Sequence, residues 1–353
     1  MAQDDSSSGA AVDRSTLRWI SNEYYELNGL HFDVLHSPPT PLEFSRLVHI
    51  GRPVLIKNCE FSEDLSRWSD EYLVRKLGDG NISVAVTPNG RADAITAGPD
   101  GRLYFAEPHV QRMSMSAFLA SLSSDSDQPQ GPEQEEICYL QSQNGNLYTA
   151  CYFNLSGDPD PSEFEPLRED VPSEIPWCSD ALEKSPDAVN LWIGDSRSIT
   201  SIHSDPYENI YTVVRGAKHF TLLPPTEGWC LEERTYPHAQ YIRSPKTSPK
   251  TSELVLSPSP STAVPIRWSS VVDPNLPGAL PAEAHPIQIS VQAGDALYLP
   301  AGWWHYVRQS SVTIALNYWY DLESRGMSWV WLNFLRGLGE PPSGNVEGKG
   351  VDS

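Results

Sequence analysis

Residues 198–225, SITSIHSDPYENIYTVVRGAKHFTLLPP, carry the clearest structural signal in this chain. Apolar and polar residues alternate on both sides of Gly216, and two prolines close the stretch. This pattern predicts two short strands, 208–214 and 217–223, joined by a tight turn and followed by residues that cannot continue a central strand.

Two motifs far apart in the chain supply a set of metal ligands. The first stretch contains a His-x-Asp pair, His203 and Asp205, and segment 294–305, GDALYLPAGWWH, places His305 at a strand end. Two histidines and one carboxylate on adjacent strands form the facial triad of non-haem Fe(II) sites, which leaves positions open for an organic co-substrate and O2. The motifs together therefore predict an iron-dependent oxygenase, although a His-x-Asp pair alone also occurs by chance.

The chain from residue 188 onward predicts a mainly β architecture. Short strand-like runs are separated by turn residues without alternating helical patterns, which is typical of an antiparallel barrel or sandwich. Segment 226–283 interrupts these runs and is rich in Pro, Ser and Thr, so we expect a long loop inserted between barrel strands. The expected strands are 188–193, 208–214, 217–223, 287–292, 296–299 and 311–320.

Helices are expected on both sides of this β region. Apolar residues recur at helical spacing over 15–27, with Ser15 as an N-cap, and a second apolar-rich helix is expected over 327–338. The second helix would pack under the barrel or form a dimer contact. Strands are expected at 52–57 and 82–87, the latter entering a hairpin at Pro88-Asn89-Gly90.

These patterns suggest a division of the chain into regions. The expected regions are a disordered tail 1–13, an N-terminal helical and strand region 14–160 packing on the barrel, the catalytic barrel 161–325, a C-terminal helix 326–340 and a disordered tail 341–353. The acidic run 123–136 is expected to be a solvated surface loop.

Composition narrows the class of partner. The chain has 353 residues with 46 acidic and 25 basic side chains, a net charge of -21. Proteins that bind nucleic acid need clustered Lys and Arg to neutralise phosphates, so we expect no nucleic-acid partner. A basic protein surface would instead be attracted to this chain.

Cysteine usage and apolar runs bear on the compartment. The five cysteines are scattered and never spaced as Cys-x-x-Cys, which argues against a disulfide framework and a zinc ribbon. Free thiols are typical of a reducing compartment, which also keeps iron ferrous. No secretory signal and no apolar run of roughly 18 residues is visible. We therefore expect a cytoplasmic protein without a membrane span, with the nucleus as an alternative location.

One lysine is expected to point inward beside the metal. Lys218 shares a strand face with Phe220 and Leu222, and a buried ammonium is costly unless it meets an anion. A co-substrate carboxylate would provide that anion, whereas the alternative is a lysine that extends to the surface. Thr200 offers a hydroxyl at the mouth of the same site, and Asn317 offers an amide or, alternatively, caps a turn. The other histidines show no ligand spacing.

These residues resemble the JmjC (Jumonji C) family of Fe(II)/2-oxoglutarate oxygenases. The metal motifs match that family, as does the lysine fifteen residues after the first histidine, and the resemblance runs from about residue 20 to 338. It extends to one subgroup through the following segments: VAVTPNGRADAI (84–95), YLQSQNGNL (139–147), PDAVNLWIG (186–194) and ALNYWYD (315–321). The loops around 121–136 and 244–262 depart from that subgroup and put the identity of the substrate in doubt.

The resemblance implies a fold and a set of site residues. The implied fold is a double-stranded β-helix, a jelly-roll or cupin-like barrel, flanked by N- and C-terminal helices through which members form dimers. His203, Asp205 and His305 would bind Fe(II), and 2-oxoglutarate would meet Lys218 and Thr200. The other implied pocket residues are Tyr139, assigned to a preceding helical region, together with Trp192, Asn209 and Asn317.

The resemblance also implies an activity. It suggests O2-dependent hydroxylation of a protein side chain, at C3 of a lysine in a GTP-binding protein of the translation-factor-related class. The rival activities are demethylation of N-methyl-lysine in histones or other proteins and endopeptidase cleavage of histone tails. A rival outside enzymology is a catalytically silent barrel that binds peptides, and a cupin-type isomerase is a weaker one.

Overall fold

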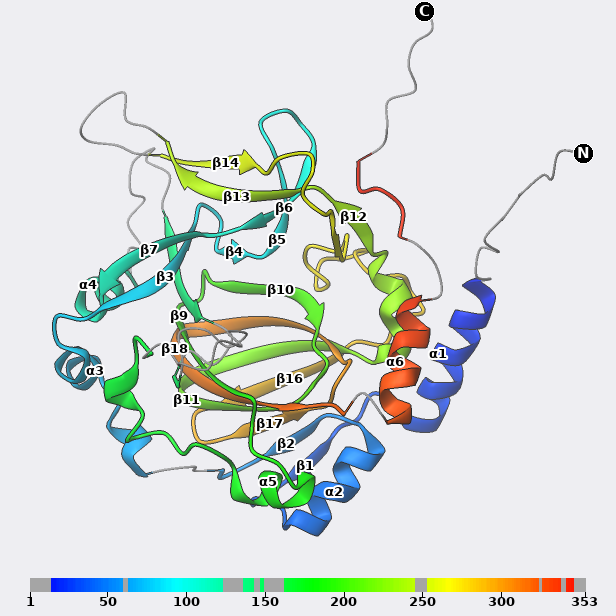
Figure 1. Ribbon diagram of the computed structural model, residues 1–353. Coiled ribbons are helices and arrows are strands. Elements are labelled where there is room, and N and C mark those ends of the chain that lie inside the picture. Colours follow the sequence, from blue (N-terminus) through cyan, green and yellow to red (C-terminus); the bar gives the residue numbers. More distant parts are fainter. Residues whose placement is uncertain are drawn as a thin grey trace, which may run out of the picture.

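The protein is described by a computed structural model (Figure 1). The structure describes residues 14–59, 63–122, 136–142, 147–148, 162–244, 253–323, 326–337 and 341–345.

A twelve-stranded sheet forms the centre of the molecule. Its path runs β1-β2-β17-β11-β18-β9-β8-β3-β7, with β16 added to β11 and with β10 joining β18 to β4. The strands are β1 (Asp33–Leu35), β2 (Val54–Ile56), β3 (Asn81–Thr87), β4 (Arg91–Ala92), β7 (His109–Ser114), β8 (Ile137–Ser142), β9 (Ala188–Gly194), β10 (Ile199–Ser204), β11 (Tyr207–Leu223), β16 (Ile287–Gln292), β17 (Ala296–Leu299) and β18 (Trp304–Asp321).

Two long strands divide this sheet into the two faces of a barrel. The first half of β11 pairs with β17 and the second half with β16, while β18 pairs first with β10 and then with β9. Register shifts around Arg215 bend β11 at the point where the partners change. Strands 208–214 and 217–223 were predicted as separate elements, but they form one bent strand. The expected double-stranded β-helix is confirmed.

Gly216 makes the bend possible. Its φ is 79°, a left-handed value that side chains disfavour, and an added Cβ would lie 2.8 Å from the Val312 carbonyl oxygen. The backbones of β11 and β18 therefore approach each other here more closely than any other residue would allow.

Helices cover the outside of the barrel (Figure 1). The helix predicted at 15–27 is present, but it begins at Arg14, so Ser15 lies inside the helix and is not its N-cap. The C-terminal helix is also present. The helical segments are α1 (Arg14–Asn28), α2 (Pro41–Ile50), η1 (Glu63–Arg67), α3 (Asp70–Leu77), α4 (Met115–Leu122), η2 (Glu165–Leu167), α5 (Pro176–Leu182), η3 (Pro225–Leu231) and α6 (Met327–Gly337).

The long inserted segment is not a structureless loop. Within 226–283 the chain forms strands that pair with each other and with the N-terminal part, building a separate four-stranded sheet and a two-stranded ribbon above the barrel (Figure 1). Sequence reasoning missed these strands because proline and serine dilute their pattern. They are β12 (Arg234–Tyr236), β13 (His238–Arg243), β14 (Leu254–Pro258) and β15 (Ile266–Trp268), and they are joined by β5 (Ala94–Ala97) and β6 (Leu103–Glu107).

Other local expectations were wrong. β3 pairs with β7 and β8, so no hairpin forms at Pro88-Asn89-Gly90, and β4 pairs with β10 instead. Residues 341–345 were expected to be disordered, but Asn345 pairs with both backbone groups of Leu103. The acidic run 123–135, most of 143–161 and the tail 1–13 lie outside the described residues.

The boundary between the predicted regions 14–160 and 161–325 stays a prediction. The central sheet runs through both regions, because β2, β3, β7 and β8 join strands from the second. Among the described residues, no helix is long and apolar enough to cross a membrane.

Candidate functional site: a metal centre and a buried lysine pocket

The three predicted metal ligands meet at one end of the barrel. His203 on β10 lies directly opposite His305 on β18 in the strand register, and their ring centroids are 4.2 Å apart. Asp205 follows β10, where its carbonyl accepts a hydrogen bond from the Gly302 amide at 2.8 Å. The ligand atoms of the three side chains all lie within 4.8 Å of one another.

Each histidine is held so that the same ring nitrogen points to the carboxylate. His203 Nδ1 lies 2.8 Å from the Ser201 carbonyl oxygen, and His305 Nδ1 lies 3.0 Å from that of Trp303. A carbonyl only accepts, so both Nδ1 atoms carry the proton and both Nε2 atoms keep a lone pair. The two Nε2 atoms lie 3.6 and 3.7 Å from Asp205 Oδ2, which is the donor set that a divalent metal takes from a facial triad.

The electrostatics favour the ligand forms of Asp205 and His305, whereas the pKa of His203 is raised because the neighbouring Asp205 outweighs the effect of burial. Burial alone would raise the pKa of Asp205, but His203, His305 and Arg336 together lower it to about 2. Burial and the neighbouring His203 lower the pKa of His305 to about 4. At neutral pH the carboxylate is therefore ionised and the His305 ring neutral, as metal binding requires.

Lys218 is buried without an anionic partner in the described part of the chain. Its side chain is 1% exposed, and Nζ donates one hydrogen bond, to Tyr139 Oη at 2.9 Å. The ammonium also faces the rings of Tyr139, Trp192 and Tyr211, with Nζ 5.3 to 5.7 Å from the three centroids. Burial lowers the pKa of Lys218 to about 7. A carboxylate bound beside Lys218 would compensate the hydration that the ammonium loses on burial and would favour its charged form.

The remaining predicted pocket residues form two hydrogen-bonded groups, which reach this lysine through Tyr139 and through the Trp192 ring. Tyr139 Oη lies 3.5 Å from Thr200 Oγ1, so the two hydroxyls converge beside the ammonium. Trp192 donates from Nε1 to Asn317 Oδ1 at 2.8 Å, and Asn317 Nδ2 donates to Asn209 Oδ1 at 3.2 Å. All six predicted residues are thus brought into connected networks. Tyr139 lies on strand β8, however, and not in the helical region from which it was expected.

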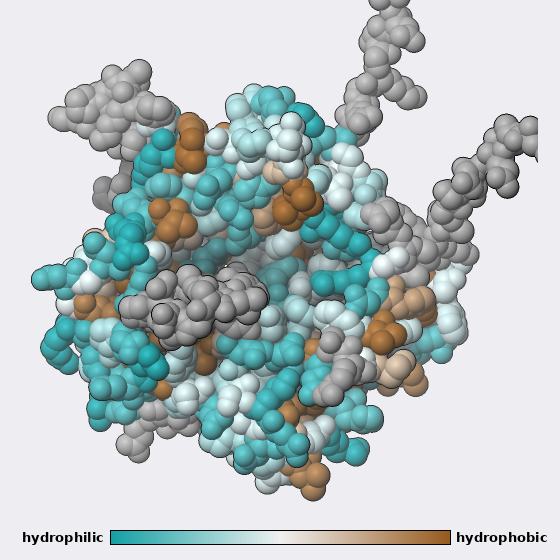
Figure 2. All heavy atoms as spheres, in the orientation of Figure 1, coloured by the Kyte–Doolittle hydropathy of each residue, from teal (hydrophilic) through white to brown (hydrophobic). Residues whose placement is uncertain are grey.

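Sequence reasoning missed two residues at the mouth of the site. Trp268, from the inserted segment, lies nearly parallel to the His203 ring with centroids 6.1 Å apart. Asp93 lies between β4 and β5, and its partly buried carboxylate accepts a hydrogen bond from Gln141. An aromatic residue and an acid in otherwise small or polar segments are the signals that could have drawn attention to them. Figure 2 shows this face of the molecule hollowed between the upper sheet and the barrel.

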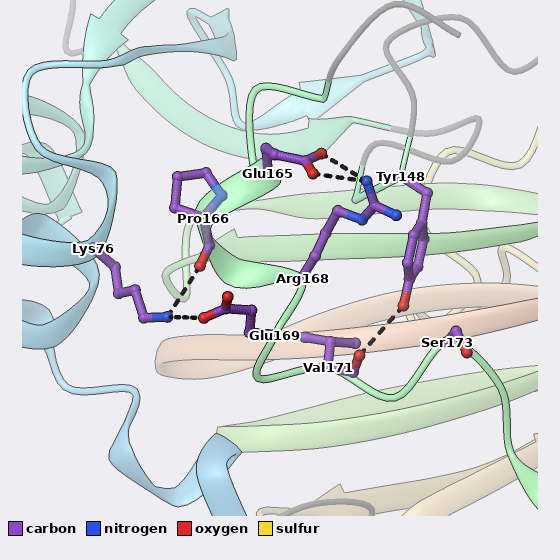
Figure 3. A pocket seen from close by; sticks show the side chains of 8 residues that line it. All are labelled: Lys76, Tyr148, Glu165, Pro166, Arg168, Glu169, Val171 and Ser173. Carbon is purple, nitrogen blue, oxygen red and sulfur yellow. Dashed lines mark hydrogen bonds and ion pairs between the residues drawn. The ribbon is translucent and has the colours of Figure 1, made fainter.

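A separate open pocket lies on the outside of the barrel (Figure 3). It has a volume of about 720 Å³ and is lined by Lys76, Tyr148, Glu165, Pro166, Arg168, Glu169, Val171 and Ser173. Its two cations are already neutralised, because Arg168 pairs with Glu165 and Lys76 pairs with Glu169. None of the predicted site residues lines this pocket.

Comparisons with known proteins agree with this geometry. Residues 39–326 match the family model described as a cupin-like domain. The chain belongs to the cupin-like JmjC family. It is 36% identical over 82% of its length to the bifunctional peptidase and (3S)-lysyl hydroxylase JMJD7 of Homo sapiens, covering 84% of that protein. It is also 36% identical over 88% of its length to lysine-specific demethylase JMJ32 of Arabidopsis thaliana, and 31% identical over 84% to JmjC domain-containing protein E of Dictyostelium discoideum, covering 87% and 86% of those proteins.

JmjC oxygenases depend on Fe(II) and 2-oxoglutarate, and the residues present fit both. The two imidazoles and one carboxylate are a suitable donor set for Fe(II). The uncompensated Lys218 ammonium and the adjoining hydroxyls would suit a carboxylate of 2-oxoglutarate.

Proposed function

We propose that this JmjC protein is an Fe(II)- and 2-oxoglutarate-dependent oxygenase that hydroxylates a lysine side chain of another protein, at C3. The observation that carries the proposal is the pairing of an open His-Asp-His triad with a buried lysine that lacks an anion. A catalytically silent peptide-binding barrel would have no use for either feature, because a buried unpaired ammonium is costly to the fold.

The proposed roles of the residues follow from their contacts. His203, Asp205 and His305 would hold Fe(II), which together with 2-oxoglutarate and O2 would supply the oxidation of an unactivated C–H bond. The backbone carbonyls of Ser201 and Trp303 fix the two imidazole rings so that their Nε2 atoms stay aimed at the metal.

Lys218 is proposed to select the co-substrate. Its ammonium would pair with the distal carboxylate of 2-oxoglutarate, while Tyr139 and Thr200 add hydroxyl donors to the same group. The aromatic rings around Nζ exclude water, which strengthens the ion pair. Trp192, Asn317 and Asn209 would fix one another's side chains next to this pocket through buried hydrogen bonds.

Lysine hydroxylation is the preferred reaction, and N-methyl-lysine demethylation is the second candidate. One relative is named a (3S)-lysyl hydroxylase and another a lysine-specific demethylase, at the same identity of 36%. The acidic chain, with a net charge of -21, favours a cationic protein segment as the substrate in either case. A GTP-binding protein is the proposed target, and this part of the proposal rests on the resemblance alone.

Endopeptidase action is disfavoured by the chemistry of the described residues. The four cysteines described are all buried, and burial raises the pKa of the Cys59 thiol to about 12, so a reactive thiolate is not at hand. The His-Asp-His group is the one metal-binding cluster found among the described residues, which leaves no separate zinc site there to activate water.

A discriminating experiment measures three products at once. The purified protein would be incubated with Fe(II), 2-oxoglutarate and a cell extract depleted of small molecules, followed by assays for succinate, formaldehyde and modified peptides. The proposal predicts succinate and lysine peptides heavier by one oxygen, with neither in the His203→Ala variant. Formaldehyde with loss of methyl groups would favour demethylation. Peptide cleavage that persists with a metal chelator would revive the peptidase.

We also propose that the protein forms a homodimer through α6. Apolar side chains remain exposed on this helix, including Met327, Trp331 and Phe334, and Trp19 is exposed on α1. Figure 2 shows apolar side chains gathered over this side of the molecule. Both helices pack against η3, and a second copy would cover their exposed faces.

A further inference from the structure

Asp93 lies at the mouth of the metal site because two sheets meet there. β4 runs parallel to β10 with Ala92 opposite Thr200. Asp93 follows Ala92 and therefore lies next to the part of β10 between Thr200 and His203. After Asp93 the chain leaves the barrel and enters β5 of the upper sheet. The φ of Asp93 is 54°, a left-handed value that is uncommon outside glycine but enriched in aspartate, and it lies where the chain passes from one sheet to the other.

The carboxylate of Asp93 has an amide partner but no cation. Gln141 Nε2 donates to Asp93 Oδ2 at 3.0 Å, and among the described residues no Lys, Arg or His forms an ion pair with Asp93. Gln141 lies two residues after Tyr139 on β8, so its side chain is on the same strand face as Tyr139, which contacts Lys218. Burial and the neighbouring Glu107 raise the pKa of Asp93 to about 6, although the Gln141 hydrogen bond and His203 act in the opposite direction.

Two aromatic side chains in contact with each other, Trp268 and Phe105, lie beside the metal ligand His203. Trp268 lies parallel to the His203 ring and is packed by Phe105, with ring centroids 4.8 Å apart. Phe105 and Glu107 are two residues apart on β6, so their side chains lie on the same face of this strand. Glu107 adds negative charge near Asp93, and its carboxylate lies 3.3 Å from His238 Nε2. Flat aromatic rings with a nearby carboxylate are suited to an alkyl chain that ends in a cation.

We propose that Asp93, held by Gln141 and lying near His203 as Trp268 does, is the specificity-determining residue that binds the ammonium group of the substrate lysine beside the metal. This inference rests on the proposed function, because it names how the same site would choose its side chain. Trp268 would contact the methylene chain, and Asp93 would accept hydrogen bonds from the ammonium. An unmethylated ammonium has three donors for this purpose and a trimethylated one has none, so the subsite favours unmodified lysine.

The test separates binding from turnover. Fluorescent heptapeptide pools with lysine, norleucine or trimethyl-lysine fixed at the centre and random flanks would be equilibrated with protein loaded with Mn(II) and N-oxalylglycine, an inert 2-oxoglutarate analogue. The variants are Asp93→Asn, which keeps the shape and the Gln141 contact, and Glu253→Gln as a control. Glu253 is an exposed acid immediately before β14, so this control removes the same charge next to another strand of the upper sheet.

We expect the wild type and Glu253→Gln to retain the lysine pool at least about tenfold more strongly than the norleucine pool, and Asp93→Asn to lose that preference. The subsite is refuted if Asp93→Asn keeps the preference, or if the wild type prefers trimethyl-lysine or shows no preference. Turnover with Fe(II) and 2-oxoglutarate is then measured on the lysine pool. If the preference depends on Asp93 but lysine is not oxidised, the subsite is supported and the hydroxylase is rejected. If lysine is oxidised but Asp93→Asn keeps the preference, the hydroxylase is supported and the subsite is rejected.

Discussion

At the scale of single residues, the most informative side chain is Lys218. It is fully enclosed by the barrel, yet the described residues offer it aromatic rings and one hydroxyl but no carboxylate. Such a group lowers the stability of the protein that contains it, so its presence argues for a ligand that supplies the missing charge.

Replacing this lysine should separate ligand binding from folding. We expect Lys218→Met to weaken 2-oxoglutarate binding by at least about 100-fold, because the ion pair is lost in a site sheltered from water. The melting temperature of the ligand-free variant should be unchanged or higher, since a buried charge is replaced by an apolar chain of similar length. Calorimetry with 2-oxoglutarate and thermal unfolding would measure both quantities. A variant that is clearly less stable but still binds the co-substrate normally would contradict this role.

The same lysine predicts a pH dependence of stability. Burial lowers its pKa from 10.5 to about 7 in the folded protein, so between these values the unfolded chain binds more protons. The free energy of unfolding should therefore rise with pH across this window, because the penalty for the buried charge is present below pH 7 and is relieved above it. Denaturant titrations of the wild type and Lys218→Met from pH 7 to 10 would isolate the contribution as the difference between them. If the free energy of unfolding of the wild type minus that of Lys218→Met stayed constant or fell with pH, the result would contradict this prediction.

Residues of the site differ in how far the sequence could predict them. His203, Asp205, His305 and Lys218 were predictable because strand alternation and motif spacing already place them on adjoining strands. Asp93 and Trp268 were not, because their proximity to His203 depends on strand pairings between distant segments. Their local sequence is dominated by turn-forming and small residues that resemble loops.

At the scale of elements, the bend of β11 builds the two faces of the barrel, and it was the part of the fold that sequence patterns described least well. The alternation of 208–223 predicted the extended conformation correctly, but the break predicted at Gly216 is a bend within one strand. A glycine inside a strand is compatible with a turn or with a bulge, and the choice depends on the pairing of β11 with β18.

Two glycine substitutions should measure the cost of this bend. Gly216→Ala places a methyl group 2.8 Å from the Val312 carbonyl oxygen at a φ of 79°, whereas Gly294→Ala has a φ of 84° and no atom within 4 Å. We expect Gly294→Ala to cost about 1–2 kcal/mol through its dihedral angle alone. Gly216→Ala should cost about 1–3 kcal/mol more through crowding. Urea denaturation would compare them, and equal losses would show that the close strand contact is unimportant.

The C-terminal helix should position the metal ligands. Arg336 donates to the Ser204 carbonyl at 3.2 Å and to its hydroxyl, and its guanidinium lies 5.4 Å from the Trp304 ring, so it joins both ligand-bearing segments. We expect Arg336→Gln to weaken Fe(II) affinity about tenfold, the scale observed for groups that orient metal ligands. Ser328→Ala, at an exposed position of α6, is the control. Unchanged Fe(II) affinity in Arg336→Gln, measured by anaerobic titration, would mean that α6 only covers the barrel.

At the scale of the whole molecule, α1 and α6 contact the turn that precedes His305 and also carry the exposed apolar side chains. Leu332 of α6 packs so closely on Gly302 that a Cβ there would collide with it, while Trp331 on the same helix is 43% exposed. Assembly through α6 would therefore bury apolar surface next to the elements that hold the metal.

The oligomeric state can be tested with one exposed residue. We expect the wild type to run at twice the mass of one chain in size-exclusion chromatography with light scattering, and Trp331→Glu to run as a monomer, because a charge cannot be buried there without a partner. Val264→Glu, at a 79% exposed apolar position of the inserted segment, should remain a dimer. A monomeric wild type would reject the proposed assembly.

The most direct test of the proposed function is an anaerobic titration of the metal-free protein with Fe(II), before and after addition of 2-oxoglutarate, followed by visible absorption. We predict one Fe(II) per chain and a charge-transfer band that needs both additions. The band should be absent in His305→Ala and should require far more 2-oxoglutarate in Lys218→Met. A wild type that binds no Fe(II), or a band that survives in His305→Ala, would contradict the assignment of the metal centre and the oxygenase function built on it.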